Sequence, residues 1–116
     1  MKAYTDIEQS KKLAKILPIE SADMYYMEAS YNIYTVGVLQ RMERNMLLKQ
    51  AEYYGMSPCW SLAALLSVLP NYQLQTQDDG IGILCSCNGK FNIVTTDNPI
   101  DTCVDMIIKL NDLNLL

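Results

Sequence analysis

A cysteine in the middle of the chain has the setting of a nucleophile. Ser57-Pro58 predicts a helix start, because serine caps helices and proline suits the first helical position. A thiolate at Cys59, in that first turn, would be stabilised by the helix dipole. Catalysis also needs a base, and the chain has no histidine, so a glutamate or lysine would have to serve. We therefore expect Cys59 to be structural and the protein to be no enzyme; a small cysteine-dependent or carboxylate-based enzyme is the alternative.

The pair Cys85-Ser86-Cys87 is the second candidate, because residues i and i+2 of a strand share one face. Together with Cys59 and Cys103 it would supply the four thiolates of a zinc site. Structural zinc sites favour two to four residues between paired ligands, and here one residue separates the pair while the other two cysteines are isolated. We expect packed thiols, without a metal or another cofactor.

Three aspartates follow one another at helical spacing near the C-terminus: Asp97, Asp101 and Asp105. This spacing stacks carboxylates along one side of a helix, where a divalent cation or a basic partner would fit. The alternative is a solvated face, because the helix dipole alone favours aspartate in the first turn. The chain has no calcium-loop pattern with its glycine, and we favour the solvated face.

Residues 24–56 contain six of the eight tyrosines and five of the seven methionines. Both residue types are enriched at protein interfaces, since they offer large, adaptable apolar area. The alternative is that they fill a small core, but adjacent tyrosines are hard to bury together. The sequence indicates an interaction surface for a protein partner or for a second copy of the chain. Its candidate residues are Tyr25, Tyr26, Tyr31, Tyr34, Tyr53, Tyr54, Met42 and Met46.

Capping and turn signals divide the chain into the elements that must position these residues. Thr5 and Glu8 predict a capping box, and Pro18 ends the helix that follows. Residues 24–29 are expected to be extended, 31–38 are strand or helix, and 39–54 form a helix with Gly55 as its C-cap. A buried helix then covers 59–69. The remaining signals predict strands over 72–76, 81–87 and 91–96, with turns at Asp79-Gly80 and Asn88-Gly89, and a last helix that begins at Asn98-Pro99.

These elements predict one α+β domain over residues 1–116, with three to four helices packed on one face of a small antiparallel sheet of three to four strands. The chain has 116 residues and a net charge of −4, with all of the surplus negative charge in residues 59–116. A nucleic-acid-binding module normally carries a basic patch, so we expect no direct binding to nucleic acid. An acidic inhibitor that mimics nucleic acid is a further alternative. The start of the chain lacks the pattern of a signal peptide and no apolar stretch is long enough for a membrane span, so we expect a cytoplasmic protein without membrane contact.

Three stretches carry a family resemblance: residues 4–24, residues 58–70, with Pro58-Cys59-Trp60-Ser61, and residues 97–116, with Asp97-Asn98-Pro99. Together they resemble a family of short uncharacterised proteins from gut anaerobic bacteria, often associated with prophage-like or conjugative elements. The family has no established activity, so the resemblance implies no catalytic residue. It implies a bacterial cytoplasmic accessory protein, and we expect a non-catalytic interaction module, a mobile-element accessory or a host-modulating factor.

Overall fold

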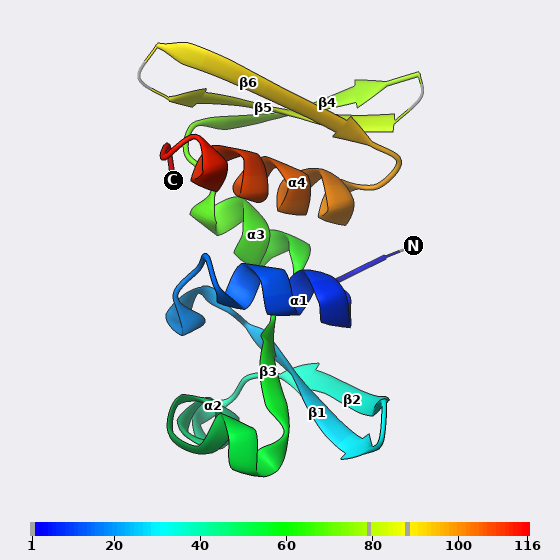
Figure 1. Cartoon of the computed structure of the whole chain (residues 1–116). Helices are drawn as coiled ribbons and strands as arrows, with labels where there is room; N and C mark the ends of the chain where they lie inside the picture. The colour runs from blue at the N-terminus through cyan, green and yellow to red at the C-terminus, as the bar shows by residue number, and fades with distance from the viewer. Residues whose placement is uncertain (1, 79, 88) are drawn as a thin grey trace.

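The computed structural model describes residues 2–78, 80–87 and 89–116. Within these residues the chain forms four α-helices and two antiparallel sheets of three strands each. This confirms the expected α+β class, with two sheets where one was expected, because residues 24–38 and 56–59 pair with each other and not with the strands of residues 72–96. The elements are stacked along the long axis of a body that measures 43 × 29 × 22 Å. Figure 1 shows one sheet at each end of this stack, with helices between them.

The N-terminal sheet has the strand order β2-β1-β3. Its strands are β1 (Met24–Ser30), β2 (Ile33–Val38) and β3 (Met56–Cys59). The β-branched residues of segment 31–38 therefore form a strand, with Val36 opposite Tyr26 of β1. Between β2 and β3 runs α2 (Arg41–Tyr54), which bends at Gln50 and ends at Gly55. As predicted, Gly55 is the C-cap, and its φ of 61° is the left-handed conformation that glycine adopts most easily.

The C-terminal sheet has the strand order β4-β5-β6 and contains the three strands expected over residues 72–96. These strands are β4 (Tyr72–Gln77), β5 (Gly80–Cys87) and β6 (Lys90–Thr96). The predicted turns at Asp79-Gly80 and Asn88-Gly89 each include one residue, Asp79 or Asn88, that lies outside the described residues. On β5, Ile83, Cys85 and Cys87 are buried, so alternate residues of this strand face the core.

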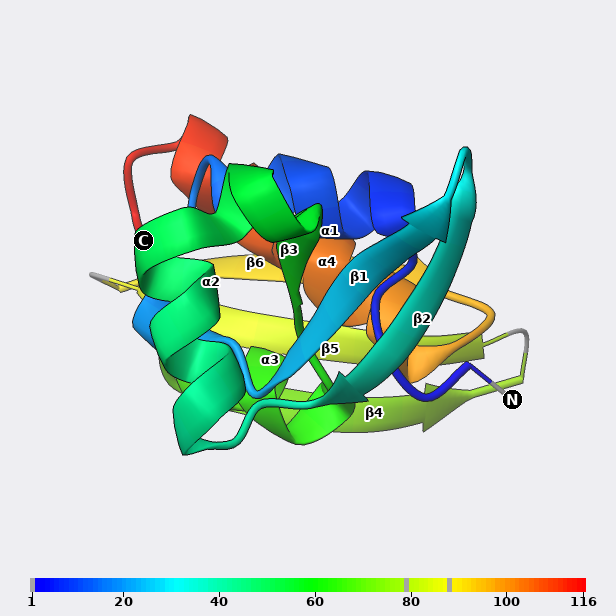
Figure 2. The same ribbon diagram turned by 90° about the horizontal axis from the view of Figure 1, so that it is seen from below.

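Helices fill the space between the sheets. α4 (Pro99–Asp112) packs on β5 and β6, and α3 (Leu62–Val68) packs on α4. α1 (Ile7–Ala14) contacts both α4 and β3. It therefore joins the half of the molecule that contains the N-terminal sheet to the half that contains the C-terminal sheet. Figure 2, seen from below, shows the N-terminal sheet and α2 in front of these helices. A short 3-10 helix, Ile19–Ser21, follows α1.

One continuous core runs through both halves. Trp60, Leu13 and Leu65 are fully buried, and so are Met106 and Ile107 of α4. All five belong to a single hydrophobic cluster that also includes side chains from both sheets. Leu65 of the helix that was expected to be buried is thus a core residue, and so is Ile107 of the last helix.

The segment around Cys59 is the main departure from the sequence prediction. Residues 56–59 form strand β3, in which Met56 lies opposite Met27 and Cys59 opposite Met24 of β1. Pro58 is tolerated because β3 is an edge strand, where one side of the backbone needs no hydrogen bonds. The helix begins only at Leu62, and its N-cap is Ser61, whose side chain accepts a hydrogen bond from the backbone N–H of Ala64. The prediction of a helix start at Ser57-Pro58 was wrong because sheet pairing overrode the local signal.

The predicted capping box of the first helix is shifted by one residue. Asp6, not Thr5, is the N-cap, and it accepts a hydrogen bond from the backbone N–H of Gln9 at 2.8 Å. The Gln9 side chain accepts in return from the backbone N–H of Asp6 at 3.1 Å. Thr5 is fully buried instead, which places its hydroxyl inside the protein.

Candidate functional site

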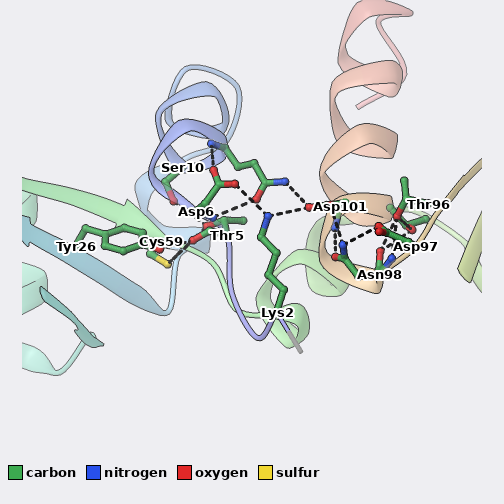
Figure 3. A network of polar contacts seen from close by, with 12 residues as sticks. Lys2, Thr5, Asp6, Ser10, Tyr26, Cys59, Thr96, Asp97, Asn98 and Asp101 are labelled. Atoms are coloured by element: carbon green, nitrogen blue, oxygen red, sulfur yellow. Dashed lines mark hydrogen bonds and ion pairs between the residues drawn. The ribbon is translucent and has the colours of Figure 1, made fainter. Parts of the chain in front are cut away.

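Cys59 lies in a buried polar cluster around Thr5, shown in Figure 3. The Thr5 hydroxyl is 2.8 Å from the Ser10 hydroxyl and accepts a hydrogen bond from the backbone N–H of Trp60 at 3.2 Å. The Cys59 thiol donates to the Thr5 carbonyl oxygen at 3.6 Å, and the Tyr26 hydroxyl donates to the same oxygen at 2.7 Å. The cluster therefore fastens the N-terminal residues to β1 and β3.

This setting does not favour a reactive thiolate. Cys59 ends a strand, so no helix dipole acts on it in the way that the sequence indicated. Its side chain is fully buried, and burial raises the pKa of the thiol above its ordinary value despite the hydrogen bonds with Thr5 and Ser10. A raised pKa leaves less of the nucleophilic form at neutral pH. The structure thus shows Cys59 as a buried member of the polar cluster around Thr5.

The other three cysteines lie between the C-terminal sheet and α4. Cys85 and Cys87 share one face of β5, as predicted, and Cys103 lies on α4, which packs on that strand. All four cysteines are free and buried, and Cys59 belongs to the other sheet. Burial raises the pKa of Cys85 to about 11 and that of Cys103 to about 12. Among the described residues, no group of three or more His, Cys, Asp or Glu side chains could hold a metal ion.

The three aspartates have different surroundings. Asp97 and Asp105 are exposed, whereas Asp101 lies between the N-termini of α1 and α4, where Lys2 reaches it at 2.9 Å. Asp101 also accepts hydrogen bonds at 2.8 Å from the side-chain amides of Gln9 and Asn98. The Lys2 hydrogen bond, against a smaller opposing effect of burial, holds the pKa of Asp101 below its ordinary value. Asp101 thus has a structural role, which leaves Asp97 and Asp105 as the solvated members of this acidic series.

Lys2 is shared between two carboxylates, since it also contacts Asp6 at 3.1 Å. Burial opposes ionisation of Asp6, but the Gln9 backbone N–H and Lys2 outweigh it, so the pKa of Asp6 is lowered. The ammonium group therefore links the N-terminal ends of two helices that are far apart in the sequence. We call this arrangement a clamp, because one ammonium group holds a carboxylate at the start of each helix.

The tyrosines and methionines of residues 24–56 do not form a single surface. Tyr31 and Tyr53 are more than four-fifths exposed and Met42 is two-thirds exposed, whereas Tyr26 is buried. Four others are partly covered: Tyr25, Tyr34, Tyr54 and Met46. The adjacent Tyr25 and Tyr26 are accommodated because successive side chains of a strand point to opposite faces of the sheet. Tyr26 points to the α1 side, and Tyr25 to the opposite face, where its ring lies against Gly37.

The exposed apolar residues of this half continue along strand β2, of which only Tyr34 was among the candidates from the sequence. Ile33 and Val38 are about 60% exposed, and Val36 is 38% exposed. Within the described part of the chain, β2 pairs only with β1, so the backbone along its other side has no strand partner. We call this unpaired side of residues 33–38, with its exposed side chains, the β2 edge. Figure 2 shows it at the periphery of the molecule.

Sequence signals for the β2 edge exist, although tyrosine and methionine content obscured them. Residues 33–38 read Ile-Tyr-Thr-Val-Gly-Val, with no charged residue and no proline. Edge strands are usually protected from further pairing by charges, prolines or bulges. An uncharged β-branched segment is thus a signal for an open edge, once its strand is known to lie at the end of a sheet.

A second surface feature is an apolar groove of about 430 Å³ beside the C-terminal end of α4. Its lining includes Ile16, Pro18, Val68 and Leu115, and its one polar side chain is Asn111. Binding sites for small molecules usually combine apolar walls with several convergent polar groups that orient the ligand. This groove has too few of them to define a substrate site.

Comparison with protein-family models, with curated proteins and with solved structures gives no match to this chain. None of the helices in the described ranges combines the length and apolar character needed to span a bilayer.

Proposed function

We propose that the protein is a non-catalytic interaction module that binds another polypeptide by adding a strand at the β2 edge. The observation that carries this proposal is the combination of an unpaired strand side with three exposed aliphatic residues, Ile33, Val36 and Val38. In strand addition, backbone hydrogen bonds supply affinity and the alternating side chains supply specificity.

The surroundings of the β2 edge support a complementary apolar partner. Tyr34, Val36 and Val38 lie on one face of β2, opposite Glu28, Tyr26 and Met24 of β1. The rings of Tyr4, Tyr26 and Tyr34 form a series of edge-to-face contacts with centroids 6.2 Å apart, which extends the apolar face to the N-terminal segment. An added strand would place every second side chain beside this face.

The two alternative functions have weaker support. An enzyme based on Cys59 would need a reactive thiolate, and this thiol is buried with a raised pKa. A nucleic-acid mimic would need a row of free carboxylates, whereas Asp101, in the middle of the candidate series, is paired with Lys2. The cellular setting that we propose, a bacterial cytoplasmic accessory of a mobile element or a host-modulating factor, depends on the family resemblance.

Binding can be tested with tagged protein immobilised as bait in a lysate of a gut anaerobe, with bound proteins identified by mass spectrometry. The variant Val38→Lys places a charge at the β2 edge. Ile93→Lys is the matched control, because Ile93 is an exposed β-branched residue in an edge strand of the other sheet. We expect a protein that the wild type and Ile93→Lys retain and that folded Val38→Lys loses. If Val38→Lys changes no association, neither with lysate proteins nor with the chain itself, the proposal is wrong.

The enzyme alternative has a separate test, which is iodoacetamide labelling of the native protein at neutral pH. We expect slow modification of all four thiols, because all are buried. Fast and selective modification of Cys59 would instead favour cysteine-dependent catalysis.

A further inference from the structure

We infer that the strand added at the β2 edge is the β2 strand of a second copy of this chain, in an antiparallel pair about a twofold axis. This inference rests on the proposed function and names its partner. The product would be one continuous sheet of six strands in the order β3-β1-β2-β2-β1-β3, since each copy contributes three.

Charge is the first argument for a second copy. The chain carries a net charge of −4, so two copies repel each other over most approaches. The β2 strand itself has no charged residue, and a pair of β2 strands therefore brings no like charges into opposition. Self-pairing is thus available at this strand despite the overall charge.

The alternation of side chains in β2 is also self-complementary. With the twofold axis beside Val36, the two Val36 side chains face each other and Tyr34 faces Val38 on both sides of the axis. Aromatic and β-branched residues in direct opposition are favourable cross-strand pairs. On the other face Thr35 lies opposite Gly37, which has no side chain and is already covered by the Tyr25 ring. Residues 34–38, which face each other in this register, include no charged side chain.

Size sets the expected strength of the contact. Six residues of strand span about 20 Å, and strand pairing with a few flanking side chains buries less than the roughly 1,200 Å² of a stable interface. We therefore expect a reversible monomer–dimer equilibrium that depends on protein concentration, rather than a permanent dimer. Because the contact is isologous, association should stop at two copies.

Sedimentation equilibrium of the full chain over a wide micromolar range tests this inference, with Val38→Lys and Ile93→Lys as matched variants. We expect the wild type and Ile93→Lys to shift from monomer to dimer as concentration rises, and Val38→Lys to remain a monomer with unchanged circular dichroism. A dimer that survives Val38→Lys, or that Ile93→Lys abolishes, would overturn the inference. A wild type that stays monomeric at all concentrations would also overturn the inference. If that monomer still captured another protein, and Val38→Lys abolished the capture, the proposed function of strand addition at the β2 edge would be supported without self-pairing.

A second variant tests the register. Val36→Cys places one new thiol of each copy beside the proposed axis, whereas the four natural cysteines are buried. Mild oxidation should convert the folded variant into a disulfide-linked dimer. Thr76→Cys in β4 is the control, because it is exposed in an edge strand of the other sheet. If the control crosslinks as fast as Val36→Cys, the paired strand is not β2 and the inference fails.

Discussion

The two sheets of this chain have the same number of strands but are covered differently. In the N-terminal sheet both faces have buried residues: Met27 and Met56 pack with the core on one face, and on the other Tyr26 and Cys59 are buried against Thr5. The C-terminal sheet is covered on one face, and on its outer face Phe91 is 70% exposed and Ile93 is 49% exposed. Figure 1 shows no helix beyond this outer face.

This difference shows how side-chain periodicity depends on surroundings. In a sheet with one covered face, every second residue of a strand is buried. β5 follows this rule from Ile83 to Cys87. A strand that is covered on both faces has no such alternation, so neighbours such as Tyr25 and Tyr26 can both contact the protein interior. In the N-terminal sheet the apolar surface that remains lies at the strand edge instead of on a face.

The largest effect should come from a charge in the core that both sheets share. Leu65→Asp places a carboxylate in a fully buried position of α3, and we expect a loss of about 4 kcal/mol or more of unfolding free energy. Urea unfolding followed by circular dichroism should show no cooperative transition from a native state. If one sheet kept a cooperative unfolding transition, the two sheets would fold independently, which would contradict a core shared by both.

A set of alanine variants sharpens the comparison between the sheets. In the C-terminal sheet, Ile83→Ala on the inner face should cost about 2–5 kcal/mol and Ile93→Ala on the outer face about 1 kcal/mol or less. In β1, the neighbours Tyr26→Ala and Met27→Ala should both cost about 2 kcal/mol or more, because both faces are covered. Urea midpoints would measure these values. A Met27→Ala cost as small as that of Ile93→Ala would show that only one face of β1 matters.

A smaller effect is expected where the N-terminal segment joins its sheet. Thr5→Val removes the acceptor of the Trp60 backbone N–H, and leaving that group unpaired should cost about 1–3 kcal/mol. The control is Thr35→Val on β2, where the exposed hydroxyl donates to Met27 at 3.3 Å and its loss should have little effect. Equal destabilisation by the two changes, measured by urea unfolding, would contradict the role of the Thr5 cluster.

The smallest effect is expected from the clamp between α1 and α4, through its pH dependence. Lys2 lowers the pKa of Asp101 in the folded state below its ordinary value of 3.8. The resulting stabilisation is complete above that value and disappears as the pH falls through the folded-state pKa. Asp101→Asn should therefore slightly lower the urea midpoint at neutral pH and weaken the loss of stability below about pH 4. Asp105→Asn, an exposed change on the same helix, should alter neither; an equal response of both variants would argue against the clamp.

Much of the fold follows from local sequence signals. The helix start at Asn98-Pro99, the C-cap at Gly55 and the alternation along residues 81–87 each depend on nearby residues, and each is present. The signal at Ser57-Pro58 failed because its outcome depended on a distant strand: Met24–Met27 pairs with Met56–Cys59. The local sequence pattern does not predict pairing with a distant strand. Proline is also common both in edge strands and at the first position of a helix, so it does not distinguish the two.

The candidate site was less predictable than the fold. Composition pointed to the half of the chain that contains the β2 edge, and Tyr31, Met42 and Tyr53 are exposed there. It could not separate them from Tyr26, because burial of a tyrosine depends on which elements cover its face. The β2 edge required knowledge of strand order, since Ile33–Val38 is open only because it lies at the end of the sequence β2-β1-β3.

The most direct test of the β2 edge as the pairing surface is amide hydrogen exchange of the wild type at low and high protein concentration. Added strand pairing protects backbone amides that otherwise exchange with water. We predict that amides within Ile33–Val38 exchange more slowly at high concentration, while those of the edge strands β4 and β6 stay unchanged. Unchanged exchange in β2, or new protection confined to β4 or β6, would contradict the account.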